Sequence, residues 1–296
     1  MTSISMTPTN TRANGGRPRN HSAVSNRTRW WWIAGTYTLA GVLVIPIYWL
    51  LVTSIRQPAE LQAASTLWPR HPFLGGWSDV LTDASFGRNL LNSLLYGVGG
   101  VVLGLLFGAG IAYAIARSRA RWARITVFAM LILQTFPSVM LALPLFILFS
   151  KMGLINNPFA VIIAIGTKTI PFMALMMRPY FADLPKAVEE AAEIDGCTKL
   201  GVLRRVVLPL TVPGMVTVSA FNFVTGWGDL LFSYTLLMDE KLQPVSVGLY
   251  KFMGQYGVDW NQLMAASVIA AIPTIVVFFT SQRFLVSGTV SGSTNE

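Results

Sequence analysis

The feature that most constrains this chain is a series of long stretches that contain no charged residue. They cover residues 31–55, 89–116, 125–150, 206–228 and 261–282, and a sixth stretch, 152–177, is interrupted only by Lys168. An α-helix needs about 20 predominantly apolar residues to cross the hydrocarbon core of a bilayer. Charged residues make up only 12% of the 296 residues, compared with about 25% in soluble domains. We therefore expect lipid to cover much of the surface.

These stretches predict six transmembrane helices and hence an all-α integral membrane protein. The expected helix cores are 31–53, 90–115, 125–149, 157–178, 212–235 and 262–283. A cleaved signal peptide is the alternative for the segment from Trp30 to Leu51. Its apolar part is longer than the usual h-region of about 7–15 residues, and no convincing small-residue cleavage site follows it. A transmembrane helix is therefore favoured there.

The distribution of positive charge predicts the orientation, because Lys and Arg accumulate in short cytoplasmic loops. With the N-terminus in the cytoplasm, most of the 22 Lys and Arg residues fall on that side. The cytoplasmic set is Arg12, Arg17, Arg19, Arg27, Arg29, Arg117, Arg119, Arg121, Arg124, Arg178, Lys186, Lys199, Arg204, Arg205 and Arg283; the outer set is Arg56, Arg70, Arg88, Lys151, Lys241 and Lys251. Both termini are therefore predicted to be cytoplasmic, in a multi-pass protein of the cell (inner or plasma) membrane. The net charge of +9 follows from this bias, so membrane lipid is expected as a partner and nucleic acid is not.

The chain is expected to form one transmembrane domain between two short tails. Residues 1–29 are rich in Ser, Thr, Asn, Arg and Gly, cannot bury a core and are predicted to be a flexible cytoplasmic tail. Residues 30–286 form the predicted transmembrane domain, and residues 287–296 a cytoplasmic C-terminal tail. Within the domain, the cytoplasmic loop 179–209 is long for a passive connector.

This loop predicts two short helices joined by a glycine. Pro185 suits the first turn of a helix, and Gly196 suits the left-handed conformation that ends one. The first helix carries acidic residues such as Glu190, and the second carries basic residues such as Lys199. Taken alone, the pattern also fits a solvated amphipathic connector, because charged faces on surface helices are common.

The spacing within the loop resembles a known motif. Glu190-Ala191-Ala192, Gly196, Val206, Leu208 and Pro209 fit the pattern E-A-A-x3-G-x9-I-x-L-P, with Val in place of Ile. This pattern is the EAA loop of permeases of binding-protein-dependent ABC importers. Other stretches resemble permeases of the carbohydrate-uptake type, most of all the second permease of maltose-type importers: Asn92-Ser93-Leu94, Ala112 to Arg117, Pro137 to Pro144, Lys151 to Leu154 and Trp227-Gly228-Asp229. Gly228 and the tail from Ser287 depart from the family pattern.

The resemblance implies a type I ABC importer permease fold and a set of partners. These are a second permease in a heterodimer, two ATPase subunits and an extracytoplasmic solute-binding protein. Glu190 would pair with a basic residue of the ATPase, Ala191 and Ala192 would allow close packing, and Gly196 would form the turn. The sequence contains no G-x-x-x-x-G-K-[ST] phosphate loop, so the chain is not expected to be an enzyme or to bind a cofactor. ATP and Mg would be used by the partner ATPase subunits.

Polar residues inside the expected spans point to a translocation path. Ser219, Asn222, Gly226, Asp229 and Ser233 recur at steps of three and four along the fifth span, so they share one helix face. Exposing that face to lipid would be costly. The face therefore either lines a polar path or forms a polar seam between helices. Lys168 lies mid-span, where an ionisable group indicates function by default; alternatively, it snorkels to the membrane edge.

The sequence thus predicts the permease subunit of an ATP-driven sugar importer. An alternative is the same architecture importing another polar solute, such as glycerol phosphate or a glycerophosphodiester. A phosphate ligand would favour a second fixed cation in the spans, where only Lys168 is present. A secondary transporter is less consistent with the sequence, because such folds often carry internal repeats and none is evident.

Overall fold

The chain is described by a computed structural model, which covers residues 26–61, 67–254 and 257–290. Most of the predicted N-terminal tail and the last six residues of the predicted C-terminal tail, 291–296, lie outside the described residues. Two units can be distinguished, residues 1–48 and residues 49–296. The described part of the first unit is helical and belongs to α1. The second unit contains the remaining elements, and it is considered by itself below.

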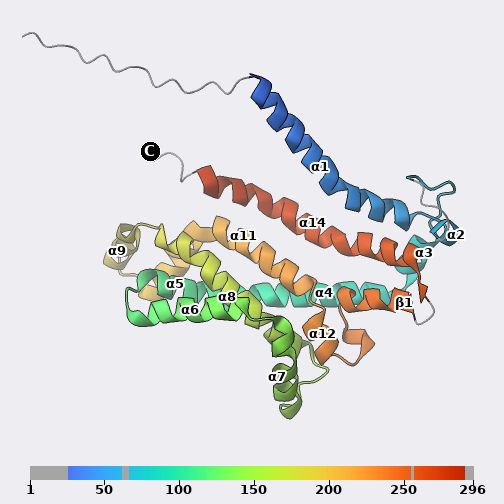
Figure 1. The fold of residues 1–296 in the computed structure, drawn as a ribbon. Helices are drawn as coiled ribbons and strands as arrows, with labels where there is room; N and C mark the ends of the chain where they lie inside the picture. Colours follow the sequence, from blue (N-terminus) through green and yellow to red (C-terminus); the bar gives the residue numbers. More distant parts are fainter. Residues whose placement is uncertain (1–25, 62–66, 255–256, 291–296) are drawn as a thin grey trace, which may run out of the picture. The chain divides into compact units, whose positions relative to one another are not determined.

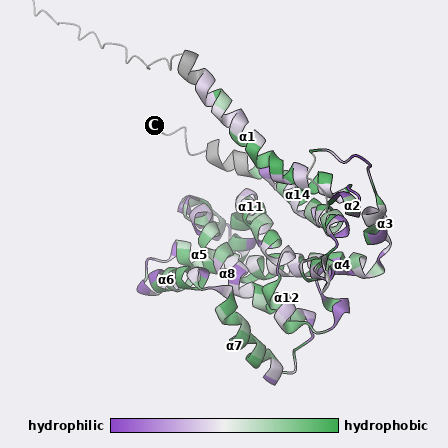
Figure 2. Ribbon diagram, turned by 45° about the vertical axis from the view of Figure 1, so that its right-hand side comes forward, coloured by the Kyte–Doolittle hydropathy of each residue, from purple (hydrophilic) through white to green (hydrophobic). Residues whose placement is uncertain are grey.

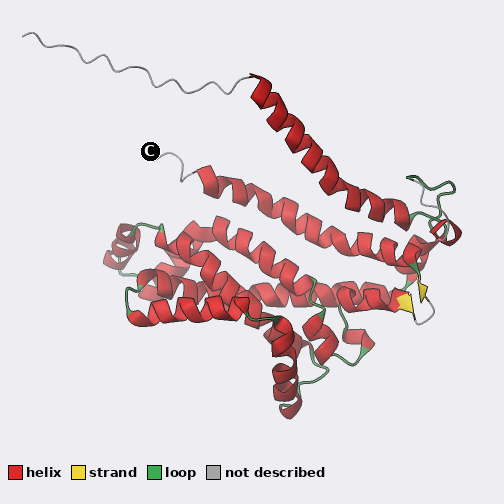
Figure 3. Cartoon of the chain, in the orientation of Figure 1, coloured by secondary structure: helices red, strands yellow, loops and turns green. Residues whose placement is uncertain are grey.

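The described residues are almost entirely helical (Figure 3). The elements are α1 (Asn26–Ser54), α2 (Pro58–Leu61), α3 (Gly75–Thr82), α4 (Ala84–Leu103), η1 (Gly104–Ala109), α5 (Gly110–Arg117), α6 (Arg121–Thr135), α7 (Ser138–Lys151), α8 (Pro158–Ala182), α9 (Lys186–Ile194), α10 (Lys199–Val202), η2 (Leu203–Val207), α11 (Leu208–Trp227), α12 (Leu231–Leu236), η3 (Glu240–Leu242), α13 (Val245–Gly248), η4 (Leu249–Phe252), β1 (Met253–Gly254), β2 (Gly257–Val258) and α14 (Trp260–Val290). The two short strands pair antiparallel, and η1 and η2 are π-helical segments inside longer helices.

The expectation of an all-α membrane protein is confirmed. Among the described residues, five helices are long and apolar enough to cross a membrane: 30–54, 84–117, 158–182, 199–227 and 260–284. The pair α6 and α7 supplies the sixth span if the two helices count as one. In Figure 2 the helices are largely hydrophobic, whereas hydrophilic residues collect in the loops at their ends.

Two of the expected helices are broken. The prediction of one helix over 125–149 is wrong, because α6 ends at Thr135 and α7 leaves it at an angle of 98°. Pro137 explains the break, since it has no N–H to donate and disfavours helical geometry at the preceding Phe136, which is extended. The prediction of one helix over 212–235 is also wrong, because α11 ends at Trp227 and α12 begins at Leu231.

Helix α11 lies at the centre of the second unit, packed against α4, α8 and α14. The close approach of these helices depends on glycine. A Cβ on Gly104 would lie 2.2 Å from Asn222 Nδ2, and one on Gly108 would lie 2.6 Å from the carbonyl oxygen of Ile170. A Cβ on Gly226 would lie 2.6 Å from the carbonyl oxygen of Tyr96. These small residues thereby let the second span pack tightly against α8 and α11.

The second unit has two distinct ends. Figure 1 shows α9 at one end, beside α5, and α12 and β1 towards the other. The orientation predicted from the charges makes the α9 end cytoplasmic and the opposite end external. Helices α4, α8, α11 and α14 therefore run between a cytoplasmic loop and a set of outer loops.

Gly226→Ala is expected to lower the stability of the protein, because the added methyl group meets backbone atoms of α4 that cannot move aside independently. Overpacking of this kind costs about 1–3 kcal/mol. The matched control is Gly110→Ala, where an added Cβ meets nothing within 4 Å and alanine is favoured in a helix by up to about 1 kcal/mol. The measurement is the midpoint of thermal unfolding of both variants in detergent. A wild-type midpoint for Gly226→Ala would contradict the close contact of α4 and α11.

Candidate functional site

The predicted cytoplasmic loop forms a rigid elbow, which we define as residues 186–207. Helix α9 ends in a turn in which Gly196 has a φ of +87°. The N–H of Gly196 donates to the carbonyl of Glu193, and the N–H of Cys197 donates to the carbonyl of Ala192, each at 3.0 Å. These bonds form a Schellman motif, which satisfies carbonyl groups left open at the end of a helix. The left-handed conformation that glycine was expected to provide is therefore present.

The second arm of the elbow starts with its own cap and continues directly into a membrane helix. The side chain of Thr198 accepts a hydrogen bond from the N–H of Gly201. From Lys199 the chain stays helical through η2 into α11. Val206 and Leu208 are half-buried in this continuous helix, and Pro209 is exposed. Any movement of the elbow is thus carried covalently into the central helix of the unit.

The outer face of α9 is exposed and partly apolar. Glu190 and Ala191 are exposed, whereas Ala192 is half-buried and packs on the core of the unit. The side chain of Ile194 is 86% exposed, and that of Leu200 in the second arm is 56% exposed. Isolated exposed apolar residues are ordinary. On the elbow they accompany the exposed carboxylate of Glu190, and apolar side chains beside a charged group can form a protein contact.

The glutamate next to Glu190 points into the protein. Glu189 Oε1 accepts hydrogen bonds from Arg117 Nε at 2.7 Å and from Arg117 Nη2, and Glu189 Oε2 accepts one from the Tyr113 hydroxyl at 2.8 Å. The Arg117 and Glu189 side chains are only 16% and 14% exposed. The sequence motif did not assign these three residues a role. The signal that could have found them is the four-residue spacing of Tyr113 and Arg117, which places both on one helix face.

The expected path residues fall into three groups. Asn222 and Gly226 are buried where α11 meets α4 and α8, and Asn222 Nδ2 donates to the carbonyl of Thr169. Ser219 lies on a separate, largely apolar groove between α4, α11 and α14. Lys168 and Asp229 line one pocket. Ser233 does not line it but donates hydrogen bonds to Asp229. The five polar positions of the fifth span therefore do not line one continuous channel within this chain.

The pocket of Lys168 and Asp229 has a volume of about 280 Å³ and is formed at the two helix breaks. Its lining residues are Ser138, Ile165, Lys168, Thr225, Gly228, Asp229, Leu230, Leu231 and Phe232. Ser138 begins α7, and residues 228–230 separate α11 from α12. Interrupted helices at membrane depth are tolerated where they line a cavity, so the breaks and the pocket form one feature.

The carboxylate of Asp229 is held in place by the start of α12. Asp229 Oδ2 accepts hydrogen bonds from the N–H of Ser233 at 2.8 Å and from its hydroxyl at 2.9 Å. Lys168 is half-buried, and no direct ion pair joins it to Asp229 in the part of the chain that the structure describes. The pocket thus offers an ammonium group, a carboxylate and the hydroxyls of Ser138 and Thr225, which can bond a ligand rich in hydroxyl groups.

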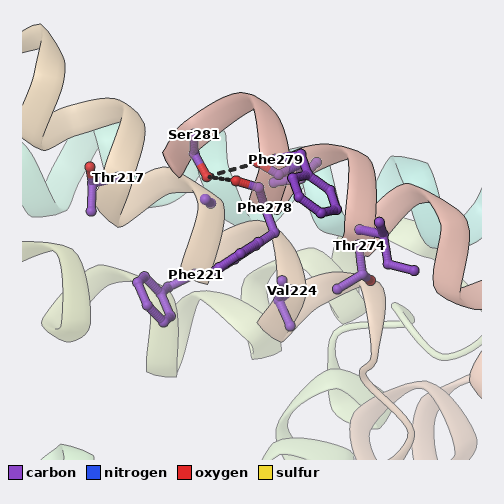
Figure 4. Close-up of a pocket in the computed structure, with 10 residues that line it drawn as sticks. Thr217, Phe221, Val224, Thr274, Phe278, Phe279 and Ser281 are labelled. Carbon is purple, nitrogen blue, oxygen red and sulfur yellow. Dashed lines mark hydrogen bonds between the residues drawn. The ribbon is translucent and has the colours of Figure 1, made fainter. Parts of the chain in front are cut away.

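A second pocket, of about 270 Å³, lies between α11 and α14 and is apolar (Figure 4). Phe221 and Val224 contribute from α11, and Phe278 and Phe279 from α14. The hydroxyl of Ser281 donates to carbonyls of its own helix, those of Val277 and Phe278. This pocket suits a lipid chain or an apolar side chain, and it offers a polar ligand little to bond. Among the described residues, no group of three or more His, Cys, Asp or Glu side chains could hold a metal ion.

Comparisons with known proteins agree on one family. The family model described as "Binding-protein-dependent transport system inner membrane component" matches residues 100–290. The chain is 30% identical over 261 residues to the sulfoquinovosyl glycerol transport system permease protein of Agrobacterium fabrum, covering 86% of this chain and 92% of that protein. It is 28% identical to the trehalose transport system permease protein of Mycobacterium tuberculosis, covering 91% of this chain and 98% of that protein.

Solved structures agree as well. A chain in the crystal structure of a bacterial ABC transporter involved in the import of the acidic polysaccharide alginate superposes with a TM-score of 0.74 at 26% identity, covering 88% of this chain and 98% of that chain. The inward-facing MetNI methionine ABC transporter, with a TM-score of 0.55 at 19% identity and covering 68% of this chain and 95% of that chain, shares the fold. The fold is therefore that of a type I ABC importer permease, and the chain is a multi-pass membrane protein and not an enzyme. It belongs to the family of binding-protein-dependent transport system inner membrane components.

Proposed function

We propose that this chain is one of two permease subunits of an ATP-driven importer for a carbohydrate, and that its elbow docks on an ATPase subunit. The observation that carries the proposal is the exposed surface of the elbow, which carries Glu190, Ala191 and Ile194 on α9 and Leu200 on α10. Apolar side chains provide area to bury, and the carboxylate selects a basic partner group, since charge complementarity contributes mainly to specificity. ATP and Mg would be bound and used by the ATPase.

The remaining partners follow from the family. Its description names a binding-protein-dependent system, and one structural neighbour is a bacterial alginate ABC transporter in complex with an alginate pentasaccharide-bound periplasmic protein. We propose an external solute-binding protein at the end of α12 and β1, two ATPase subunits at the α9 end, and a second permease beside this one in a heterodimer. In that assembly this chain would form half of the translocation path.

Two observations support a carbohydrate as cargo. The relatives compared above are named for sulfoquinovosyl glycerol and trehalose transport, and another is a diacetylchitobiose uptake permease of Streptomyces coelicolor. The pocket at the helix breaks contains Lys168, Asp229 and hydroxyl groups, which suits a polyol. The alternative cargo is another polar solute such as glycerol phosphate or a glycerophosphodiester. Asp229 disfavours it, because a half-buried carboxylate in the pocket repels a phosphate.

Glu190→Lys is expected to release the ATPase from the purified complex and to reduce uptake by more than about tenfold, because like charges at a docked interface cost several kcal/mol. The matched control is Glu193→Lys, an equal charge reversal on the same helix. Measured from the inward-pointing Glu189, position 190 lies about 100° round the helix and position 193 only about 40°, nearer the protein. ATPase that still co-purifies with Glu190→Lys as it does with wild type would refute the docking assignment.

Gly196→Ala is expected to impair uptake through backbone strain alone. The positive φ costs a non-glycine residue about 1–2 kcal/mol, while an added Cβ would meet nothing within 4 Å. Gly196→Asn is the matched variant, because asparagine tolerates the left-handed region better than alanine does. The expected order of uptake is wild type, then Gly196→Asn, then Gly196→Ala. Equal uptake by the alanine variant and wild type would show that the turn has no influence on coupling.

Asp229→Asn is expected to lower uptake by about tenfold, since a charge-assisted hydrogen bond to a ligand contributes about 1.5–3 kcal/mol. The ATPase should stay bound, because Asp229 lies at the opposite end of α11 from the elbow. Asp183→Asn removes an exposed carboxylate after α8 and serves as the control. Uptake and ATPase co-purification are measured in the same membranes. Unchanged uptake at a normal expression level would assign Asp229 to helix capping only.

A further inference from the structure

The buried pair of Arg117 and Glu189 joins the elbow to a helix that the chain itself does not connect to it. Along the chain, the elbow continues through η2 into α11. Arg117 and Tyr113, by contrast, lie on α5, at the cytoplasmic end of the span formed by α4, η1 and α5. The elbow therefore has two attachments to the membrane part, one covalent and one through side chains.

The side-chain attachment consists of hydrogen bonds to the residues just before α9 and to the first turn of α9. Arg117 Nη2 donates to the carbonyl oxygen of Leu184 at 3.1 Å, directly before α9 begins. The same guanidinium binds the Glu189 carboxylate through two nitrogens, and Tyr113 binds the other carboxylate oxygen. The Tyr113 ring packs edge-on against Phe181, with 5.8 Å between ring centroids. Such a geometry fixes both the position and the orientation of α9 relative to α5.

The other end of the same span is bonded to the outer loops. Asn92 Nδ2 donates to the carbonyls of Lys241 and Gln243 at 2.9 and 3.0 Å. The Tyr96 hydroxyl donates to the carbonyl of Leu242 at 2.7 Å. Because α4, η1 and α5 are helical without interruption from Ala84 to Arg117, one rod connects the elbow to the outer loops.

The rod is also bonded to the region that lines the polar pocket. The Ser93 hydroxyl donates to the carbonyl of Trp227 at 3.3 Å and accepts a hydrogen bond from the N–H of Val245 at 2.9 Å. Trp227 is the last residue of α11, directly before the break at 228–230. A displacement of the rod therefore acts on the break, whereas the covalent route through η2 acts on the opposite end of α11.

We propose that Arg117, Glu189 and Tyr113 are positioning residues that make the α4–η1–α5 rod follow the elbow when the ATPase moves it. The proposal rests on the proposed function, since it requires an ATPase docked on α9. Removing one partner of a buried, hydrogen-bonded charge pair leaves the other charge unpaired and loosens the joint. The elbow would then still be moved by the ATPase, but the rod would no longer follow it.

The test uses the full chain in its complex with the second permease and the ATPase, in lipid nanodiscs. Cys197 is replaced by alanine, and spin labels are attached in pairs at exposed positions. The elbow pair is Glu193→Cys with Asp183→Cys, and the rod pair is Ala114→Cys, on α5, with Asp183→Cys. Distances are measured before and after trapping with MgATP and orthovanadate. In wild type, both pairs are expected to shift on trapping.

In Glu189→Ala, the elbow pair is expected to keep its shift, while the shift of the rod pair falls by at least about half. Glu189→Gln keeps a hydrogen-bond acceptor without the charge and should give an intermediate loss; it serves as the test if the alanine variant does not assemble. Arg119→Ala, which removes an exposed arginine two residues from Arg117, should behave as wild type. A wild-type rod shift in Glu189→Ala, or a loss of the elbow shift in that variant, would overturn the proposal.

The same measurement separates this inference from the proposed function. If the ATPase does not dock on the elbow, the wild-type elbow pair shows no shift on trapping, and Glu190→Lys leaves the ATPase bound. If the docking is correct and the positioning role is wrong, the wild-type elbow pair shifts and Glu189→Ala leaves the rod shift unchanged.

Discussion

Backbone N–H and C=O groups within a bilayer find no water, so each one must be bonded inside the protein. This constraint makes most described residues of the second unit helical, and within the membrane it restricts interruptions to places where other groups supply the bonds. At the break after Trp227, Asp229 accepts from the N–H of Ser233, and the Ser246 hydroxyl donates to the carbonyl of Asp229 at 2.6 Å. At the break after Thr135, the N–H of Phe136 still bonds back to Ile132. The polar pocket is lined by residues from both breaks, Ser138 at the start of α7 and residues 228–230 between α11 and α12.

The sequence predicts much of this architecture, because the strongest signals are local. Charge-free length marks the spans, and the spacing of Glu190, Gly196 and Pro209 marks the elbow. The breaks are harder to predict. Pro137 suggests a kink, but a bend of 98° depends on what α7 packs against, namely α12. The break at residues 228–230 contains no proline, and the hydrophobic residues on both sides of it in the sequence predict a continuous helix.

The sequence predicts which site residues share a face only where those residues lie on one continuous helix. The steps of three and four from Ser219 to Ser233 assume a continuous helix, and the end of α11 at Trp227 redirects the last members of that series. Helical spacing also cannot say which neighbour a face meets. Asn222 therefore bonds the carbonyl of Thr169 in a seam, while Asp229 reaches a pocket. The spacing of Tyr113 and Arg117 places both on one helix face, but the local pattern does not show that Glu189 is their partner, because the contact is between residues far apart in the sequence.

Two neighbouring glutamates of the elbow face in different directions. Glu189 bonds to α5, and Glu190 is exposed. About 100° separates adjacent positions on a helix, so Glu189 can be buried against α5 while Glu190 stays exposed on the docking face. A docking surface transmits movement only if the helix that carries it cannot rotate or slide on its own base. The hydrogen bonds of Glu189 hold the start of α9 in place, and the Schellman turn at Gly196 holds its end. Because coupling between two sites is reciprocal, the same rigid connection would let events at the outer loops and the pocket alter the elbow. If the elbow docks on an ATPase as proposed, movement would pass in both directions along α4 and α5.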